Sequence, residues 1–299
     1  MKQSYFPGQG IWLKGNLHSH TTVSDGVCTP SDIVNAYEAK GYDFFSMTDH
    51  NIFFRHEGFP DSNMLLLNGV EHDLAYSRIK CIHVVGIGSS WEKKDTGYLC
   101  RKYAPDELTD QQLIDMMRED GQFVVLAHPI WSRMEPEEVT SLKGFHAIEV
   151  YNHGAENLCH AGHSEVYWDI LLRRGMRVLA TASDDTHQLH DRFGGWVWVK
   201  AAEKSYDSVI KALFDGNFYA SSGPVIYDFG IDGDAVYVEC SECREIHVVT
   251  WPPRGKSFFA EDDAKLNGIS YPLKGGEKYV RVECVDFNGR TAWTNPIFL

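Results

Sequence analysis

The sequence predicts a mixed α/β fold, with a distorted β/α barrel over residues 1–222 and a small all-β, sandwich-like domain over residues 223–299. In the first part, short apolar runs alternate with helical patterns, which indicates a parallel sheet. Nearly every apolar run ends in His, Asp or Glu. A barrel of about seven strands explains this repetition, because it brings all the strand ends around one axis.

An open, doubly wound sheet is the alternative architecture for the same alternation of strands and helices. It would place polar residues from its two outer strands too far apart to meet. The barrel therefore accounts better for strand ends that carry the same kinds of side chain.

The stretch from residue 17 to residue 51 predicts the first sector of such a barrel. His18 and His20 are separated by one residue in an extended segment, so both side chains point to the same side. The next strand pattern, over residues 42–47, is followed by Asp49 and His50. Because a βαβ crossover makes the two strands parallel, both sets of polar side chains emerge at the same edge.

Helical patterns lie between the apolar runs, and each ends at a glycine. The first helix is expected to begin after Thr29 as N-cap, with Pro30 in its first position, and to end at Gly41. Its apolar face consists of Ile33, Val34 and Tyr37. The later patterns cover residues 106–120, 164–174 and 205–215.

The later apolar runs bring further side chains that could bind metal or substrate. His83 lies within its run, and the residues at the ends of the other runs are Glu71, His128, Asn152, His153, Asp184, Asp185 and His187. Histidine and carboxylate ligands without paired thiolates suit borderline or hard divalent metals. The sequence therefore predicts a metal centre at the carboxyl ends of the strands.

After residue 223 the helical patterns stop and short strand patterns follow one another. Asn288-Gly289 between two strand-like runs is a strong hairpin signal. Cys240 and Cys243 form a lone C-x-x-C with no second pair, which by itself does not predict a zinc site. This part is expected to form a small sandwich packed on the barrel.

Composition narrows the classes of protein that the chain can represent. The 299 residues are 43% hydrophobic, enough for a large core, yet no apolar run approaches the roughly 18 residues of a membrane helix. Seven irregularly placed cysteines, with no secretory signal pattern at the start, predict reduced thiols and a cytoplasmic location. A net charge of −14 argues against binding to long nucleic acids, which rests on positive surfaces.

Residues 15–222 resemble the polymerase and histidinol phosphatase (PHP) superfamily of metal-dependent phosphoesterases. The resemblance rests on short motifs in the order that the family has them. They are H-S-H-T followed by S-D-G, T-D-H-N, G-V-E, I-H-V-V-G, A-H-P and S-D-D-T-H. The resemblance implies a distorted (β/α)7 barrel that holds two or three divalent ions, commonly zinc, manganese or iron.

When the metal ligands of the family are transferred motif by motif, the resemblance implies a set of ligands for each ion. His18 and His20 would bind one ion with Glu71, the bridging carboxylate, and with an aspartate near the end of the barrel. His83 and His128 would bind a second ion, and a further position would be bound by Asp25, His50 and His187. The last motif is usually S-D-x-H, so both Asp184 and Asp185 stay candidates. Some relatives have His where this chain has Asp25, which affects the third ion.

The expected reaction is hydrolysis of small phosphate esters, of the nucleotide or sugar-phosphate type, by a hydroxide that bridges two ions. Glu71, His187 and His153 are the candidate catalytic residues, the two histidines as proton donors to the leaving group. Arg78, Arg192 and Asn152 are the candidate substrate-binding residues, because Arg offers a bidentate fork to phosphate.

Two other functions stay open at this point. A bridging hydroxide can also attack a carbonyl, so the second reading is a metal-dependent hydrolase of a carbamate, amide or carboxylic ester. The third is a noncatalytic metal-binding module that serves a partner through the β domain. The number of ligand candidates argues against the third reading, because structural metal sites usually hold four ligands.

Overall fold

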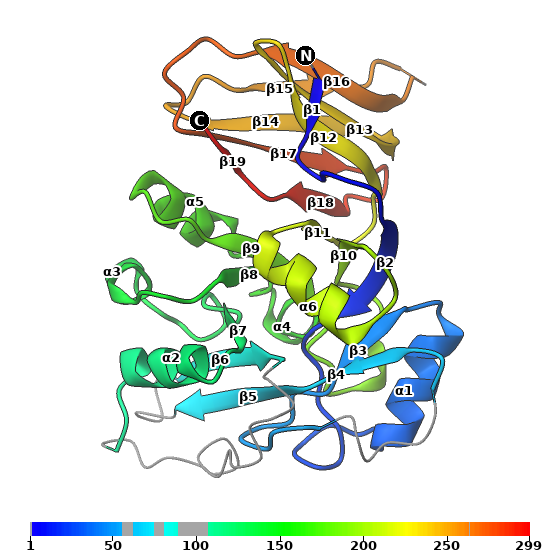
Figure 1. The fold of residues 1–299 in the computed structure, drawn as a ribbon, viewed down its shortest axis with the longest axis vertical. Helices are drawn as coiled ribbons and strands as arrows, with labels where there is room; N and C mark the ends of the chain where they lie inside the picture. The colour runs from blue at the N-terminus through cyan, green and yellow to red at the C-terminus, as the bar shows by residue number, and fades with distance from the viewer. Residues whose placement is uncertain (1, 56–61, 75–80, 89–106, 263) are drawn as a thin grey trace.

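Figure 1 shows a computed structural model of the chain, which describes residues 2–55, 62–74, 81–88, 107–262 and 264–299. The C-terminal strands lie at the top of this view, and the mixed α/β part lies below them. The N-terminal strand also lies at the top, among the C-terminal strands. The fold is therefore a mixed α/β fold with many strands and few helices.

The strands up to residue 222 are β1 (Lys2–Ser4), β2 (Ile11–Asn16), β3 (Phe44–Ser46), β4 (Leu65–Leu67), β5 (Gly69–Leu74), β6 (Ile82–Ile87), β7 (Phe123–Leu126), β8 (Ala147–Asn152), β9 (Leu179–Ser183), β10 (Trp196–Ala201) and β11 (Phe218–Ser221). The helices are α1 (Pro30–Ala39), α2 (Asp110–Glu119), α3 (Pro136–Ser141), α4 (His153–Cys159), α5 (Glu165–Arg173) and α6 (Tyr206–Asp215), with a 3₁₀ turn at Leu189–Asp191. The later strands are β12 (Ile226–Asp232), β13 (Ala235–Cys243), β14 (Glu245–Trp251), β15 (Lys256–Phe259), β16 (Leu266–Pro272), β17 (Tyr279–Val285), β18 (Thr291–Thr294) and β19 (Ile297–Phe298).

The N-terminal part contains two runs of hydrogen-bonded strands instead of one continuous ladder. One sheet has the order β5-β6-β7-β8-β9, and the other contains β11-β10-β2-β3-β4. The pairs β2–β3, β3–β4, β7–β8 and β8–β9 are parallel, as the sequence predicts. The pairs β5–β6 and β6–β7 are antiparallel, which departs from the prediction. Only residues 75–81 separate β5 from β6, too short a segment for the crossover that parallel strands require.

Isolated bridges link the two sheets at the edge where the polar strand ends lie. Ser19, beyond the end of β2, pairs with Thr186, beyond the end of β9. His50, beyond the end of β3, pairs with Glu71 of β5, and the amide of Thr48 donates to the carbonyl of Ser19 at 2.8 Å. The extensions of β2 and β3 are thereby held between β9 and β5.

The predicted helix after Thr29 is confirmed, together with its cap and its stop. The Thr29 hydroxyl accepts a hydrogen bond from the amide of Asp32, Pro30 is the first helical residue, and Gly41 follows with φ of +74°. The apolar face of Ile33, Val34 and Tyr37 is buried, as predicted.

The other predicted helices are confirmed with shifted bounds. Helix α2 begins after Thr109, later than predicted, because Thr109 and Gln112 form a capping box. In α5, Trp168 and Leu171 are buried, whereas Val166 is 68% exposed. Helices α3 and α4 were not predicted from the sequence, and both are short.

The C-terminal strands enclose a core of their own between two layers. One layer has the order β1-β12-β13-β16, and the other contains β15, β14, β17 and β18. Asn288-Gly289 lies in the predicted hairpin between the antiparallel strands β17 and β18. The division into domains 1–222 and 223–299 stays a prediction, since β1 pairs with β12 and β18 pairs with β11. Among the described residues, no helix has the length and apolar character of a membrane span.

Arg281 joins the C-terminal part to helix α5 through a buried ion pair. Its side chain, on β17, is 2% exposed and donates to Asp169 Oδ1 from Nη2 at 2.8 Å and from Nε at 3.2 Å. The guanidinium lies 4.5 Å from the ring centroid of Trp168 and also pairs with Glu283. A buried guanidinium with two carboxylates and an aromatic face has its charge balanced only while this interface is formed.

Replacing Arg281 with Ala is expected to lower the free energy of unfolding by about 2–3 kcal/mol, because it removes charge-assisted hydrogen bonds to Asp169 and the contact of the guanidinium with Trp168. Arg290→Ala is the control, since Arg290 pairs with Asp286 from an exposed position and should cost under about 1 kcal/mol. Urea unfolding of the three proteins measures both effects. Equal losses in the two variants would contradict the role given to Arg281.

Candidate metal centre

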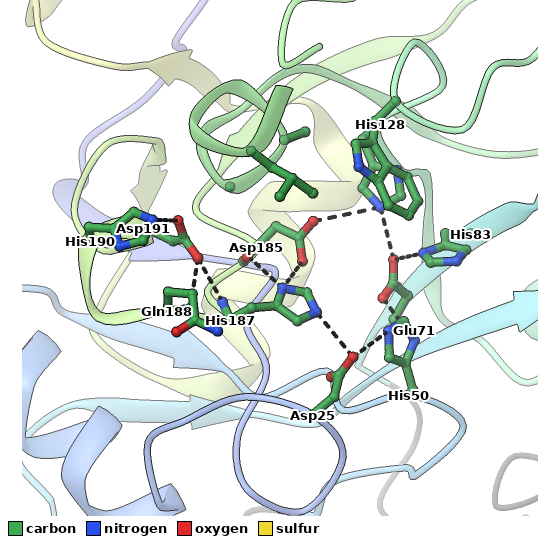
Figure 2. Close-up of a pocket in the computed structure, with 14 residues that line it drawn as sticks. Asp25, His50, Glu71, His83, His128, Asp185, His187, Gln188, His190 and Asp191 are labelled. Atoms are coloured by element: carbon green, nitrogen blue, oxygen red, sulfur yellow. Dashed lines mark hydrogen bonds and ion pairs between the residues drawn. The ribbon is translucent and has the colours of Figure 1, made fainter. Parts of the chain in front are cut away.

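The ligand candidates of different strands converge at one edge of the N-terminal sheets. Figure 2 shows His50, His83, His128, Asp185 and His187 around Glu71 and Asp25, and these residues come from segments far apart in the sequence. His18 and His20 are buried beside them, with ring nitrogens Nε2 only 3.2 Å apart. The structure therefore brings together side chains that the sequence places at successive strand ends.

Glu71 lies at the centre of this arrangement. It is 0% exposed, and its two carboxylate oxygens face several imidazoles. The distances are 3.2 Å to His18 Nε2, 3.1 Å to His20 Nε2, 3.2 Å to His50 Nδ1, 2.9 Å to His83 Nδ1 and 3.2 Å to His128 Nε2. A carboxylate in this position can be shared between neighbouring metal ions.

The donor atoms fall into overlapping groups, each small enough to surround one ion. In each group, all the donor atoms lie within 4.8 Å of one another. Three groups are His18, His20, Glu71 and Asp185; His50, Glu71 and His83; and His20, Asp25, His50 and His187; a further group is His18, His128 and Glu149. Glu71 belongs to the first two groups, so ions bound there would be neighbours.

The residues present fit divalent metal ions, because the cluster leaves buried polar atoms without hydrogen bonds. Among the described residues, these atoms include His50 Nδ1, Glu71 Oε2 and Asp185 Oδ1. Buried polar atoms are normally paired, and a missing ion is one physical reason for an exception. Imidazole and carboxylate donors are also the ligands that zinc, manganese and iron accept.

Charge balance in the cluster leads to the same conclusion. Burial raises the pKa of the Glu71 carboxyl, but the surrounding imidazoles, led by His18, outweigh burial and hold this pKa well below its usual value. Burial lowers the pKa of His18, but Asp185 and Glu71 raise it well above its usual value. Without a cation, protonated imidazoles must balance the carboxylates. A metal ion would replace those protons, since only the neutral imidazole binds metal.

Two further carboxylates support the cluster from outside. Glu149, 1% exposed, accepts hydrogen bonds from His18 Nδ1 at 2.8 Å, from the amide of His128 at 3.0 Å and from Asn152 at 2.8 Å. A carboxylate on the far nitrogen of a metal-binding imidazole fixes the ring orientation and its tautomer. Glu149 belongs to none of the sequence motifs, although an acidic residue inside a buried strand is a usable signal.

Asp49 holds the loop that carries Asp25. Its carboxylate accepts hydrogen bonds from the amide of Thr21 at 2.8 Å and the hydroxyl of Ser24 at 2.7 Å. Gly26 follows in this loop, where a Cβ atom would lie 2.5 Å from the carbonyl oxygen of His20. Only glycine lets the chain turn this closely around a ligand candidate.

Asp184 and Asp185 point to different surroundings. Asp185 Oδ1 lies 3.2 Å from His18 Nε2 and 3.1 Å from His20 Nε2. Asp184 accepts the hydroxyl of Tyr37 at 2.6 Å and three backbone amides of residues 193–195 at 2.7–2.8 Å. Asp185 therefore lies among the ligand candidates, while Asp184 anchors the loop before β10.

A cavity of about 340 Å³ opens above the cluster (Figure 2). Its residues combine ligand candidates with a partly apolar wall. They are Asp25, His50, Glu71, His83, His128, Trp131, Gly154, Ala155, Leu158, Asp185, His187, Gln188, His190 and Asp191. The predicted site did not include Trp131, Leu158 and His190. Neither helical spacing nor position at a strand end marks these residues as part of a site.

Several predicted site residues lie outside this cavity. His153 packs its ring under Gly194 and is hydrogen-bonded to the hydroxyl of Tyr151 at 2.9 Å. Asn152 is 0% exposed, where it donates to Glu149 and to Asp185.

Of the two predicted phosphate-binding arginines, only Arg192 lies in the described part of the chain, and it does not line the cavity. Arg192 donates to the carbonyl of Leu189 and lies over the ring of Phe193, away from the cavity-lining residues. Arg78 lies outside the described residues.

The fold and the cluster together define a mixed α/β protein with a buried centre of histidine and carboxylate ligands at its strand ends. No known protein family matches the sequence, and no curated protein sequence matches it significantly. The fold is similar to that of a two-domain protein from Bacteroides vulgatus, which is described as containing a predicted PHP-like metal-dependent phosphoesterase. The TM-score is 0.53 at 15% identity, over 99% of this chain and 98% of that one. This similarity is consistent with the PHP resemblance of the sequence.

Two more distant structures match smaller parts of the chain. A lesion-specific endonuclease from Pyrococcus furiosus matches 68% of this chain and 56% of its own, with 14% identity and a TM-score of 0.47. An amidohydrolase from Chromobacterium violaceum matches 58% of this chain and 88% of its own, with 18% identity and a TM-score of 0.42.

Asp185→Asn and Asp184→Asn are expected to separate metal binding from stability. Asp185→Asn should lower the bound metal per chain with little loss of stability, because the change removes a donor atom from the first group. Asp184→Asn should lower the free energy of unfolding by about 3 kcal/mol or more, since several charge-assisted hydrogen bonds weaken together. Elemental analysis and urea unfolding measure the two quantities. The assignment is wrong if Asp184→Asn loses metal while Asp185→Asn retains it.

Proposed function

We propose that this chain is a metal-dependent phosphoesterase of the PHP superfamily that hydrolyses small phosphate esters, such as nucleotide or sugar phosphates. The position of Glu71 carries the proposal, because its buried oxygens face imidazoles of two neighbouring ligand groups. Ions that share a carboxylate lie close enough to act on one phosphate group. The fold similarity to the Bacteroides vulgatus protein, with its PHP-like description, supports the same function.

The cofactors in this proposal are two or three divalent ions of zinc, manganese or iron. The three groups of donor atoms would hold them, with His128 beside Glu71 and His83. Bound ions would neutralise phosphate oxygens and lower the pKa of a water molecule. The seven strands β2, β3 and β5 to β9, joined by ladders and by the isolated bridges, support the distorted (β/α)7 barrel as part of this proposal.

His187 is the candidate proton donor for the leaving group in a two-ion form, in which the position of Asp25, His50 and His187 holds no ion. Its side chain is 32% exposed and lines the cavity, 3.4 Å from Asp25 Oδ2. Burial lowers the pKa of His187, but the hydrogen bond with Asp25 and the charge of Asp185 raise it to about 9. His187 therefore carries a proton at neutral pH in the metal-free protein. His153 lies outside the cavity, so His187 is the one proposed proton donor of the two candidate histidines.

The cavity supports a small substrate. Trp131 and Leu158 offer an apolar surface beside the ligand candidates, which suits a nucleobase or the carbon side of an organic phosphate. The net charge of −14 favours such a substrate over long nucleic acid. The cytoplasmic location stays a prediction.

A second candidate function is hydrolysis of an amide, carbamate or carboxylic ester. One observation favours it: no Lys or Arg lines the cavity within the described part of the chain. A phosphate dianion gains more from such side chains than a neutral carbonyl does. We place phosphate esters first because shared divalent ions would neutralise phosphate oxygens themselves.

The metal-loaded enzyme is expected to release phosphate from a panel of nucleotides and sugar phosphates, and Glu71→Gln should lower this rate more than about a hundredfold. The reason is that Glu71 would contact the ions directly, while replacing outer residues of metal sites lowers activity only about 10–100-fold. Phosphate release with zinc, manganese or iron, before and after chelation, is the measurement.

Glu261→Gln, at an exposed position of the β-rich part, is the matched control and should keep full activity. The same panel includes carboxylic esters, carbamates and amides. Turnover of these compounds without any release of phosphate would replace the first candidate with the second.

His187→Gln is expected to slow hydrolysis of sugar phosphates by about 10²–10⁴-fold, the usual contribution of a general acid. An aryl phosphate with a good leaving group should be affected far less, because its leaving group needs no proton. His160→Gln, at a side chain that is 92% exposed, is the control. Equal losses on both substrates, together with loss of one metal ion per chain, would make His187 a ligand instead.

A further inference from the structure

Three buried cysteines meet in the core of the C-terminal part, far from the cluster around Glu71 in the sequence. Cys240 and Cys243 lie on β13 of one layer, and Cys284 lies on β17 of the other. Their exposures are 2%, 0% and 0%. The three sulfur atoms all lie within 4.8 Å of one another. The cluster therefore spans the space between the two layers.

A β-bulge is what brings the first two thiols together. In a regular strand, residues three apart point to opposite faces. The ladder between β13 and β16 shifts register between Glu239 and Cys243, so both Cys240 and Cys243 point into the core while Glu242 stays exposed. Bulges commonly serve to re-aim a side chain.

The spacing of the sulfur atoms suits a shared metal ion. Cys240 Sγ and Cys243 Sγ lie 3.9 Å apart, far beyond the ~2.05 Å of a disulfide bond. Two sulfurs bound to one zinc ion at ~2.3 Å stand about 3.8 Å apart in a tetrahedron.

We propose that Cys240, Cys243 and Cys284 form a second metal site, which binds a thiophilic ion, Zn²⁺ or Cu⁺, and cross-links the two layers of the C-terminal sandwich. Thiolate ligands select these ions, whereas the histidine and carboxylate centre suits harder ones. Binding replaces thiol protons with the ion, and no oxidant or reductant takes part. This site is independent of the proposed phosphoesterase activity.

Cobalt substitution tests the site in the full-length, reduced and metal-stripped protein. Co²⁺ bound to thiolates gives intense near-ultraviolet charge-transfer absorption, and Co²⁺ bound only to histidine and carboxylate does not. We expect this absorption in the wild-type protein, its loss on addition of Zn²⁺, and its absence in Cys284→Ala. Cu⁺, added without oxygen, is the second probe and should give near-ultraviolet thiolate absorption at one ion per cluster.

Three variants locate the signal. Glu71→Gln should keep the absorption, because Glu71 belongs to the other centre. Cys159→Ala, at an exposed thiol, and Cys28→Ala, at a buried thiol in another core, should also keep it. If Cys284→Ala does not fold, the comparison of wild type with Glu71→Gln still decides the question.

The proposal is overturned if neither Co²⁺ nor Cu⁺ gives thiolate absorption in the wild-type protein. It is also overturned if Glu71→Gln or Cys159→Ala abolishes the absorption, or if the purified protein contains a disulfide between two of the three cysteines. In each of these cases the thiols would be core side chains or a redox pair, not ligands.

Discussion

The burial of the Glu71 carboxylate among imidazole rings is the constraint on which the rest of the N-terminal part depends. A buried charge is tolerated only where opposite charges or hydrogen bonds surround it. Those partners come from beyond the ends of β2, β3 and β7 and from the start of the antiparallel strand β6. These four strands must therefore present their histidines at one edge, and the isolated bridges of Ser19 and His50 hold the extensions of β2 and β3 there.

Residues around the cluster hold its ligand candidates in place through hydrogen bonds. Glu149 fixes the orientation of His18, Asn152 reaches Glu149 and Asp185 from one amide group, and Asp49 shapes the loop of Asp25. Such contacts keep donor atoms in place before an ion arrives, which reduces the ordering that binding requires. The open side of the cavity has fewer of these constraints, since Asp25 and His187 are partly exposed.

Local signals in the sequence predicted the parts of the structure that depend on neighbouring residues. Thr29 and Gly41 marked a helix, Asn288-Gly289 marked a hairpin, and the histidines sat at strand ends. The antiparallel pairing of β6, the bridges between the sheets and the contact of Cys284 with the C-x-x-C could not be predicted in this way. They depend on segments far apart in the chain, whose pairing is decided by tertiary packing and not by local propensity.

The pairing of β11 with β18 has a consequence for how the chain is completed during synthesis. Strand β11, which also pairs with β10, receives its second partner only when residues 291–294 have been made, whereas β1 is made first and pairs only once β12 has been made. Until then the N-terminal part presents an unpaired strand edge, a template for association with other chains. Strand β18 thus covers the free edge of β11 in the part of the chain that carries the candidate metal centre. A chain shortened at residue 222 would expose this edge of β11 permanently.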